Sequence, residues 1–90
     1  MTNLREYRTE YGAIADNIAD NCMDGFGLDF ADNGHGDYCE LVQYSVDFGE
    51  NEGFGVMVVD NLGRKTFYHV ESDNLEMGER LFANVCDAYL

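Results

Sequence analysis

The sequence predicts an α+β protein with the order α-β-β-β-β-α, in which an antiparallel sheet carries two helices on one face. Apolar residues recur at helical spacing near both ends of the chain and alternate with period two between them. Clusters of Gly, Asn and Asp separate the extended segments, and strands joined by such short turns pair antiparallel. The 90 residues, 46% of them hydrophobic, suffice for one domain with its own core.

The first helix is expected near the N-terminus. Its apolar stripe, with spacings of three and four residues, consists of Leu4, Tyr7, Tyr11, Ile14 and Ile18. Asn3 stands where an N-cap belongs, and Gly25 offers a C-terminal stop. Asp16 and Asp20 each lie about 200° around the helix from an isoleucine, and Asp24 continues their row. The predicted helix therefore has a core side and a separate carboxylate side.

Strands are predicted at residues 26–31, 38–48, 54–59 and 66–70, with turns at 32–37, 49–53 and 60–65. One face of the second strand consists of Val42, Tyr44, Val46 and Phe48. The third strand is apolar on both faces, whereas two helices on one side would leave its other side open. We therefore expect another molecule to cover Met57 and Val59, as in a homodimer or a partner interface.

The second helix is expected to close the chain. The run Ser72-Asp73-Asn74 followed by Glu76 is an N-cap signal. The apolar stripe that follows consists of Leu75, Gly78, Leu81, Phe82, Val85 and Tyr89. A mid-helix glycine costs about 1 kcal/mol relative to alanine, but at Gly78 the missing side chain lets the helix lie close to the sheet.

Charge is distributed unevenly along the chain. The net charge is -13, from 18 Asp and Glu against 5 Lys and Arg. Residues 9–63 contain 12 carboxylates and no Lys or Arg, so local ion pairs cannot neutralise the middle of the chain. This sign of charge excludes direct nucleic-acid binding and disfavours anionic membranes. No apolar run approaches the roughly 20 residues that a membrane-spanning helix needs.

Cysteine usage indicates a reduced protein. Cys22, Cys39 and Cys86 are odd in number and form no CxxC motif, and the N-terminus lacks the basic and then apolar run of a signal peptide. We expect three unpaired thiols and a cytoplasmic location.

Residues 29–40 resemble an EF-hand calcium loop. The matching positions are Asp29, Asn33, Gly34, Asp37 and Glu40. Ala31 replaces an oxygen ligand, and the flanking segments read as strands where an EF-hand has helices. A polar turn with side-chain caps accounts for the same residues. His35 and His69, taken with the cysteines, lack the spacing of a zinc site or a Cys/His pair, so we expect no metal, no cofactor and no enzymatic activity.

Nine carboxylates are the candidate partner-binding residues: Asp16, Asp20, Asp24, Asp29, Asp32, Asp37, Glu40, Glu50 and Glu52. In size, charge and the carboxylate row of its first helix, the chain resembles the small acidic DNA-mimic inhibitors of bacteriophages and mobile elements, the anti-CRISPR and anti-restriction proteins. That resemblance implies an inhibitor that occupies the basic nucleic-acid channel of a host defence nuclease or effector. Two other functions fit the same charge: an immunity protein that neutralises a basic toxin nuclease, and a salt-adapted acidic domain with no charge-specific partner.

Overall fold

The computed structural model describes residues 3–22 and 27–90. In these ranges the elements are η1 (Leu4–Glu6), α1 (Gly12–Asn21), β1 (Asp29–Asp32), β2 (Tyr38–Val46), η2 (Asp47–Gly49), β3 (Asn51–Val59), β4 (Lys65–Val70) and α2 (Leu75–Tyr89), where η marks a 3-10 helix. The predicted class and the order of helices and strands are confirmed. Asp24, Gly25 and Phe26 lie outside the described residues, so the row, the helix stop and the strand start assigned to them stay predictions.

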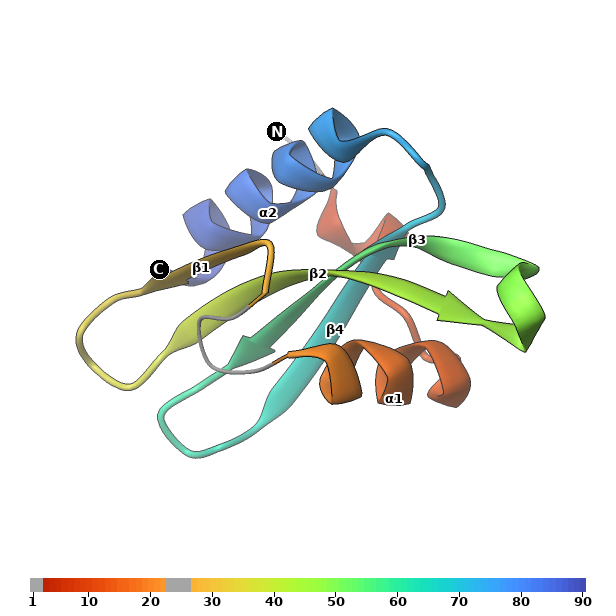
Figure 1. Ribbon diagram of the computed structural model, residues 1–90. Helices are drawn as coiled ribbons and strands as arrows, with labels where there is room; N and C mark the ends of the chain where they lie inside the picture. The colour runs from red at the N-terminus through yellow and green to blue at the C-terminus, as the bar shows by residue number, and fades with distance from the viewer. Residues whose placement is uncertain (1–2, 23–26) are drawn as a thin grey trace.

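The strands form one antiparallel sheet in the order β1-β2-β3-β4, so each strand lies beside its neighbours in the chain (Figure 1). Short turns can join only adjacent antiparallel strands, which is why the turn residues of the sequence dictate this order. β2 and β3 are nine residues long and pair over their full length, from Tyr38 opposite Val59 to Val46 opposite Asn51. β1 pairs with residues 38–41 of β2, and β4 pairs with residues 54–59 of β3.

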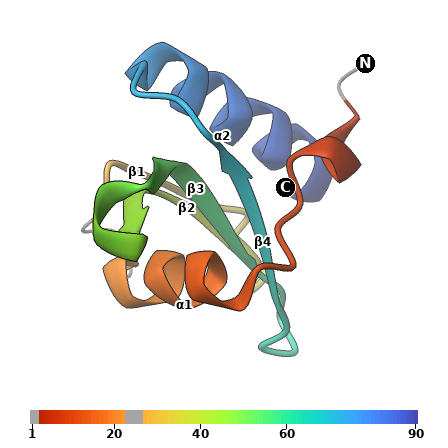
Figure 2. The same ribbon diagram turned by 90° about the vertical axis from the view of Figure 1, so that its right-hand side faces the viewer.

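The helices α1 and α2 cover opposite faces of the sheet, so the prediction that both lie on one face is wrong (Figures 1 and 2). Val56 and Val58 of β3 belong to the core cluster beneath α2, whereas the alternate residues Met57 and Val59 belong to the cluster beneath α1. Each apolar face of β3 thus has a helix of the same chain to remove it from water. Met57 and Val59 are 5% and 6% exposed, so they give no reason to expect a second copy.

The N-terminal apolar stripe is divided between the two faces, so the predicted continuous helix is wrong at its start. After η1 the chain runs beside β4, where the backbone N–H of Thr9 donates to the carbonyl of Phe67 at 3.0 Å. The backbone N–H of His69 donates to the carbonyl of Tyr7 at 2.6 Å. Tyr7 packs on the α2 side, whereas Ile14 packs on the α1 side. The crossing satisfies backbone groups at the edge of β4, which a helix over the same residues would leave unpaired.

α2 begins where its cap signal predicts. The side chain of Asn74 accepts a hydrogen bond from the backbone N–H of Glu76 at 2.9 Å. Gly78 lies against the ring of Phe54, which confirms the close approach expected there. Asn3 also caps, but its side chain caps η1 and not an α-helix. Within the described ranges, no helix has both the length and the apolar character needed to cross a membrane.

Candidate acidic interface

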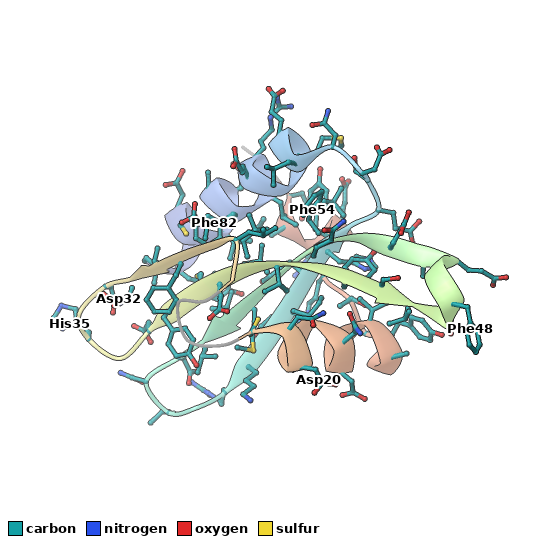
Figure 3. All side chains as sticks on the ribbon, viewed as in Figure 1. Asp20, Asp32, His35, Phe48, Phe54 and Phe82 are labelled. Carbon is teal, nitrogen blue, oxygen red and sulfur yellow. The ribbon has the colours of Figure 1, made fainter. Side chains whose placement is uncertain are left out.

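α1 presents a carboxylate side away from the sheet. Ile14 and Ile18 are 2% and 0% exposed beneath the helix, whereas Asp16 and Asp20 are exposed on its outer side. Figure 3 shows Asp20 pointing away from the sheet. The offset of about 200° between apolar and acidic positions separates the two sides. That separation is confirmed for Asp16 and Asp20, and their contact with a partner stays a prediction.

Two asparagines hold α1 against the part of β2 that lies beyond the end of β1. The backbone N–H of Ser45 donates to Asn17 Oδ1 at 3.1 Å, and Asn21 Nδ2 donates to the carbonyl of Gln43 at 3.2 Å. Asn21 Nδ2 also donates to Asn17 Oδ1 at 3.0 Å. Side chains of one helix therefore satisfy a strand edge that no residue of β1 reaches in the described chain. This attachment fixes which side of α1 faces outward.

The described part of the chain contains two ion pairs, and both lie far along the sequence from α1. Arg64 Nε lies 2.7 Å from Asp60 Oδ2 in the β3–β4 turn, and Arg80 Nη2 lies 3.5 Å from Glu76 Oε1 on α2. The pKa of Asp60 is lowered, chiefly by the hydrogen bond from the backbone N–H of Arg64. Both pairs are local, so among the described residues neither involves a carboxylate of α1 or of the β2–β3 turn.

The β1–β2 loop is a polar turn held by side-chain hydrogen bonds, as one of the two interpretations of residues 29–40 predicts. Asn33 Oδ1 accepts two backbone N–H bonds within the loop, and Asn33 Nδ2 donates to Asp37 Oδ2 at 2.7 Å. Asp37 Oδ1 accepts from the backbone N–H of Asn61 at 2.8 Å and so ties this loop to the β3–β4 turn. Asp29 and Asp32 are exposed. Among the described residues, no group of three or more His, Cys, Asp and Glu side chains is arranged to hold a metal ion.

Glu40 is buried, which corrects its assignment as a surface carboxylate. Its side chain is 0% exposed and belongs to the face of β2 that also carries Val42 and Tyr44. Gly27 lies over it, since a Cβ at that position would be 2.9 Å from Glu40 Oε2. The period-two alternation that groups Val42 with Tyr44 includes Glu40 as well, and this is the sequence signal for its burial.

The β2–β3 turn carries the exposed ring of Phe48, which was predicted to lie on a strand face. The turn was predicted at residues 49–53, but it begins at Asp47, because Asp47 and Phe48 adopt left-handed conformations with φ of 55° and 58°. It ends before Asn51, where β3 begins, so the predicted strand start at residue 54 is three residues too late. Asp47 Oδ2 accepts hydrogen bonds from Tyr11 Oη at 3.0 Å and from Asn51 Nδ2 at 2.8 Å. The bond to Asp47 raises the pKa of Tyr11. The Asp and Gly residues that flank Phe48 are the sequence signal for an earlier turn.

The exposed candidate carboxylates form three groups and not one patch. Asp16 and Asp20 lie on α1, and Asp29 and Asp32 lie on β1. Glu50 and Glu52 lie in or beside the β2–β3 turn. Figure 3 shows Asp32 and Phe48 near opposite ends of the molecule, whose longest extent is 37 Å. The hydrogen bond between Tyr11 and Asp47 joins the start of α1 to the β2–β3 turn. The carboxylates of α1 and of that turn therefore lie on two elements that are directly bonded to each other.

Several groups with acid–base or nucleophilic chemistry are withdrawn from solvent. The rings of Tyr44 and His69 stack with their centroids 5.6 Å apart, and burial raises the pKa of Tyr44 to about 12 while it lowers the pKa of His69. Cys86 packs against the buried cluster that contains Cys39, and burial raises the pKa of Cys39 to about 12. A raised thiol pKa opposes nucleophilic reactivity, so these residues give no support to a catalytic Cys/His pair.

Comparison with known proteins adds no family assignment. No protein-family model, curated protein or solved structure matches this chain.

Proposed function

We propose that this protein is an acidic inhibitor that binds a basic, nucleic-acid-binding protein and occupies the surface on which nucleic acid would lie. The observation that carries the proposal is the set of exposed carboxylates on the outer side of α1 and at the β2–β3 turn, which form no ion pair within residues 3–22 and 27–90. The expected partner is a nuclease or effector of a host defence system, of the kind that anti-CRISPR and anti-restriction proteins inhibit. In this role the protein performs no catalysis and binds no nucleic acid itself.

The carboxylates of α1 are spaced to imitate phosphates. Asp16 and Asp20 are four residues apart, a rise of about 6 Å along the helix axis. Phosphates of one strand repeat every roughly 3.4 Å of duplex axis and lie further apart along the backbone. Opposite charge also accelerates encounter with a basic partner and fixes the register of the complex. A partner that neutralises these carboxylates removes the repulsion that they cause in the free protein.

Two other functions predict different partners. An immunity protein would use the same surface against a toxin nuclease, so the identity of the bound protein separates it from a defence inhibitor. A salt-adapted domain would retain no basic protein at any salt concentration, because its charge serves hydration alone.

The proposal is tested by affinity capture from native host lysate at low and high salt, followed by titration of the captured protein. We expect a nucleic-acid-binding protein whose affinity falls steeply as salt rises, because the charge contacts are screened. The triple variant Asp16→Asn, Asp20→Asn, Asp24→Asn should bind it roughly 5- to 150-fold more weakly and with a shallower salt slope. The nuclease activity of the captured protein should fall as wild-type protein is added.

A matched control removes three carboxylates from the other side of the sheet. Asp73, Glu79 and Asp87 are exposed on α2 or just before it. Their replacement by Asn, Gln and Asn changes the net charge by the same amount but should weaken binding far less. Equal affinity and equal salt dependence for the wild type and the α1 variant would show that the α1 row is merely solvated.

A further inference from the structure

The β2–β3 turn stands at the free end of a two-stranded ribbon. β1 pairs with β2 at residues 38–41, and β4 pairs with β3 at residues 54–59, so the ribbon beyond them is flanked by neither strand. Figure 1 shows this end of the ribbon projecting from the body of the molecule, and Figure 3 shows Phe48 at this end. A residue placed there reaches a partner before the rest of the sheet does.

Phe48 is unfavourable in both its backbone conformation and its exposure. Its φ of 58° and ψ of 34° lie in the left-handed region, which L residues with large side chains rarely adopt. Its relative exposure is 110%, the highest among the exposed large hydrophobic residues of the described chain. The ring therefore adds nothing to the core and faces water entirely. Backbone strain and full exposure at one residue, which contributes no packing to the core, indicate a function in recognition.

Three hydrogen bonds to Asp47 hold the strained turn in place. Asp47 Oδ2 accepts hydrogen bonds from Tyr11 Oη at 3.0 Å and from Asn51 Nδ2 at 2.8 Å. The backbone N–H of Glu50 donates to the carbonyl of Asp47 at 3.1 Å. Tyr11 is the N-cap residue of α1, so the turn is anchored to the same helix that carries the carboxylate row. A ring presented on a fixed turn loses little entropy on binding.

The charge around the ring selects the kind of partner. Asp47, Glu50 and Glu52 are exposed beside Phe48, and the sequence from residue 44 to residue 53 contains no Lys, Arg or His. Anionic lipid and a second copy of this turn would both be repelled. A complementary surface must combine cations with an apolar or aromatic platform. Grooves that bind single-stranded nucleic acid have this composition, because Lys and Arg track the phosphates while aromatic side chains stack on the bases.

We propose that Phe48 takes the place of an unstacked base, and Asp47 and Glu50 the place of the neighbouring phosphates, in a single-stranded nucleic-acid groove of the basic partner. This inference rests on the proposed function and narrows it, since a duplex-binding surface offers no platform for an isolated ring. The row on α1 and the ring on the turn then contact one groove, with the hydrogen bond between Tyr11 and Asp47 setting their spacing.

Photo-crosslinking from the ring position tests the assignment. p-Benzoylphenylalanine replaces Phe48 in one protein and Leu62 in a control; Leu62 is 74% exposed in the β3–β4 turn, beside Arg64 and Lys65. Each protein is irradiated in host lysate with or without a dT30 oligonucleotide or a 30-base-pair duplex as competitor. We expect an adduct from position 48 alone, attached beside aromatic and basic residues of a nucleic-acid-binding protein, which dT30 suppresses at lower concentration than the duplex does.

Substitution measures the contribution of the ring. Crosslinking identifies the partner, and the inhibitor is then titrated to displace labelled dT30 from the unmodified partner. Phe48→Ser should require about 5- to 150-fold more inhibitor than the wild type, as loss of one stacked base does. Phe48→Trp should restore displacement, and Leu62→Ser should change it less than twofold. Circular dichroism checks that each variant is folded, which we expect because both side chains are exposed and neither belongs to the core.

The outcomes separate this inference from the proposed function. Capture of a basic partner by the unmodified protein, with no adduct from position 48 or no effect of Phe48→Ser, overturns the role of the ring and leaves the acidic inhibitor standing. Equal suppression by dT30 and by the duplex overturns the single-stranded assignment. Failure of the unmodified protein to retain any basic partner overturns both.

Discussion

Gly78 of α2 lies directly against the ring of Phe54 in β3. A Cβ at position 78 would come within 2.6 Å of Phe54 Cγ and 2.8 Å of its Cβ. Phe54 is 4% exposed and packs in one cluster with Leu81 and Val85. The absent side chain therefore lets α2 settle onto the sheet at the distance that close packing of this cluster requires.

Replacement Gly78→Ala should lower the free energy of unfolding by up to about 2 kcal/mol. Alanine favours the helix by about 1 kcal/mol, but overpacking against Phe54 costs roughly 1 to 3 kcal/mol or more. Urea denaturation measures the difference. Gly12→Ala is the control, because a Cβ at Gly12 in the first turn of α1 meets no atom within 4 Å and should be neutral or stabilising. A more stable Gly78→Ala protein would mean that α2 can lift from the sheet without loss.

Replacement Phe48→Asn should raise the free energy of unfolding by about 0.5 to 1 kcal/mol. Asparagine tolerates a left-handed backbone better than phenylalanine does, and the exposed ring supplies no packing to lose. The contrasting variant Gly49→Ala, at φ 88° with open space around it, should lose about 1 kcal/mol. Thermal and urea unfolding of the two variants should therefore shift in opposite directions. A destabilised Phe48→Asn protein would show that the ring has a structural role.

His69 should make stability fall as the pH drops below about 6.5. Burial lowers its pKa in the folded state, with Glu71 acting in the opposite direction, so the unfolded chain takes up a proton first. Stability is therefore unaffected by His69 above its ordinary pKa, declines as pH falls through that value, and stops declining below the folded pKa. Urea unfolding at pH values from about 7.5 to 5.5 should show a flatter profile for His69→Gln.

Cys39 should resist alkylation until the protein unfolds. It is 0% exposed, and its pKa is raised from 9.0 to about 12, which lowers the thiolate fraction at pH 8 roughly a thousandfold. Mass spectrometry after iodoacetamide treatment should show Cys39 labelled only when urea is added, with three modified cysteines in the unfolded, unreduced chain. A mass two hydrogens lower, with a single labelled thiol, would reveal a disulfide and contradict the three free cysteines of the structure.

The N-terminal segment shows where local patterns stop being sufficient. Leu4, Tyr7, Ile14 and Ile18 have helical spacing, yet the first two pack on the α2 side of the sheet and the last two on the α1 side. The spacing shows which residues are apolar, but whether they form a helix or pair with an edge strand depends on unpaired backbone groups of β4 nearby. Those groups are in place only once the sheet has formed.

The candidate interface divides in the same way. The opposition of Ile18 to Asp16 and Asp20 follows from helical periodicity, so the carboxylate side of α1 was predictable. The exposure of Phe48 was not predicted, because period-two alternation continues to Phe48, whereas β2 ends at Val46 and two residues with positive φ follow it. The flanking Asp47 and Gly49 signal a turn here but do not fix where the ring points. Glu40 is the opposite case: it is polar, yet its position in the alternation of β2 is a buried one. Its polarity alone would place it on the surface.

The sequence by itself determined the order of the strands, their antiparallel pairing and the cap of α2 at Asn74, because each depends on residues close together in the chain. Only the tertiary structure decided which face each helix covers and which charged and aromatic groups remain outside. Both apolar faces of β3 had to be removed from water, and one chain with α1 beneath and α2 above does so by itself. That division turns Asp16 and Asp20 outward on one side and leaves Phe48 alone at the free end of the ribbon.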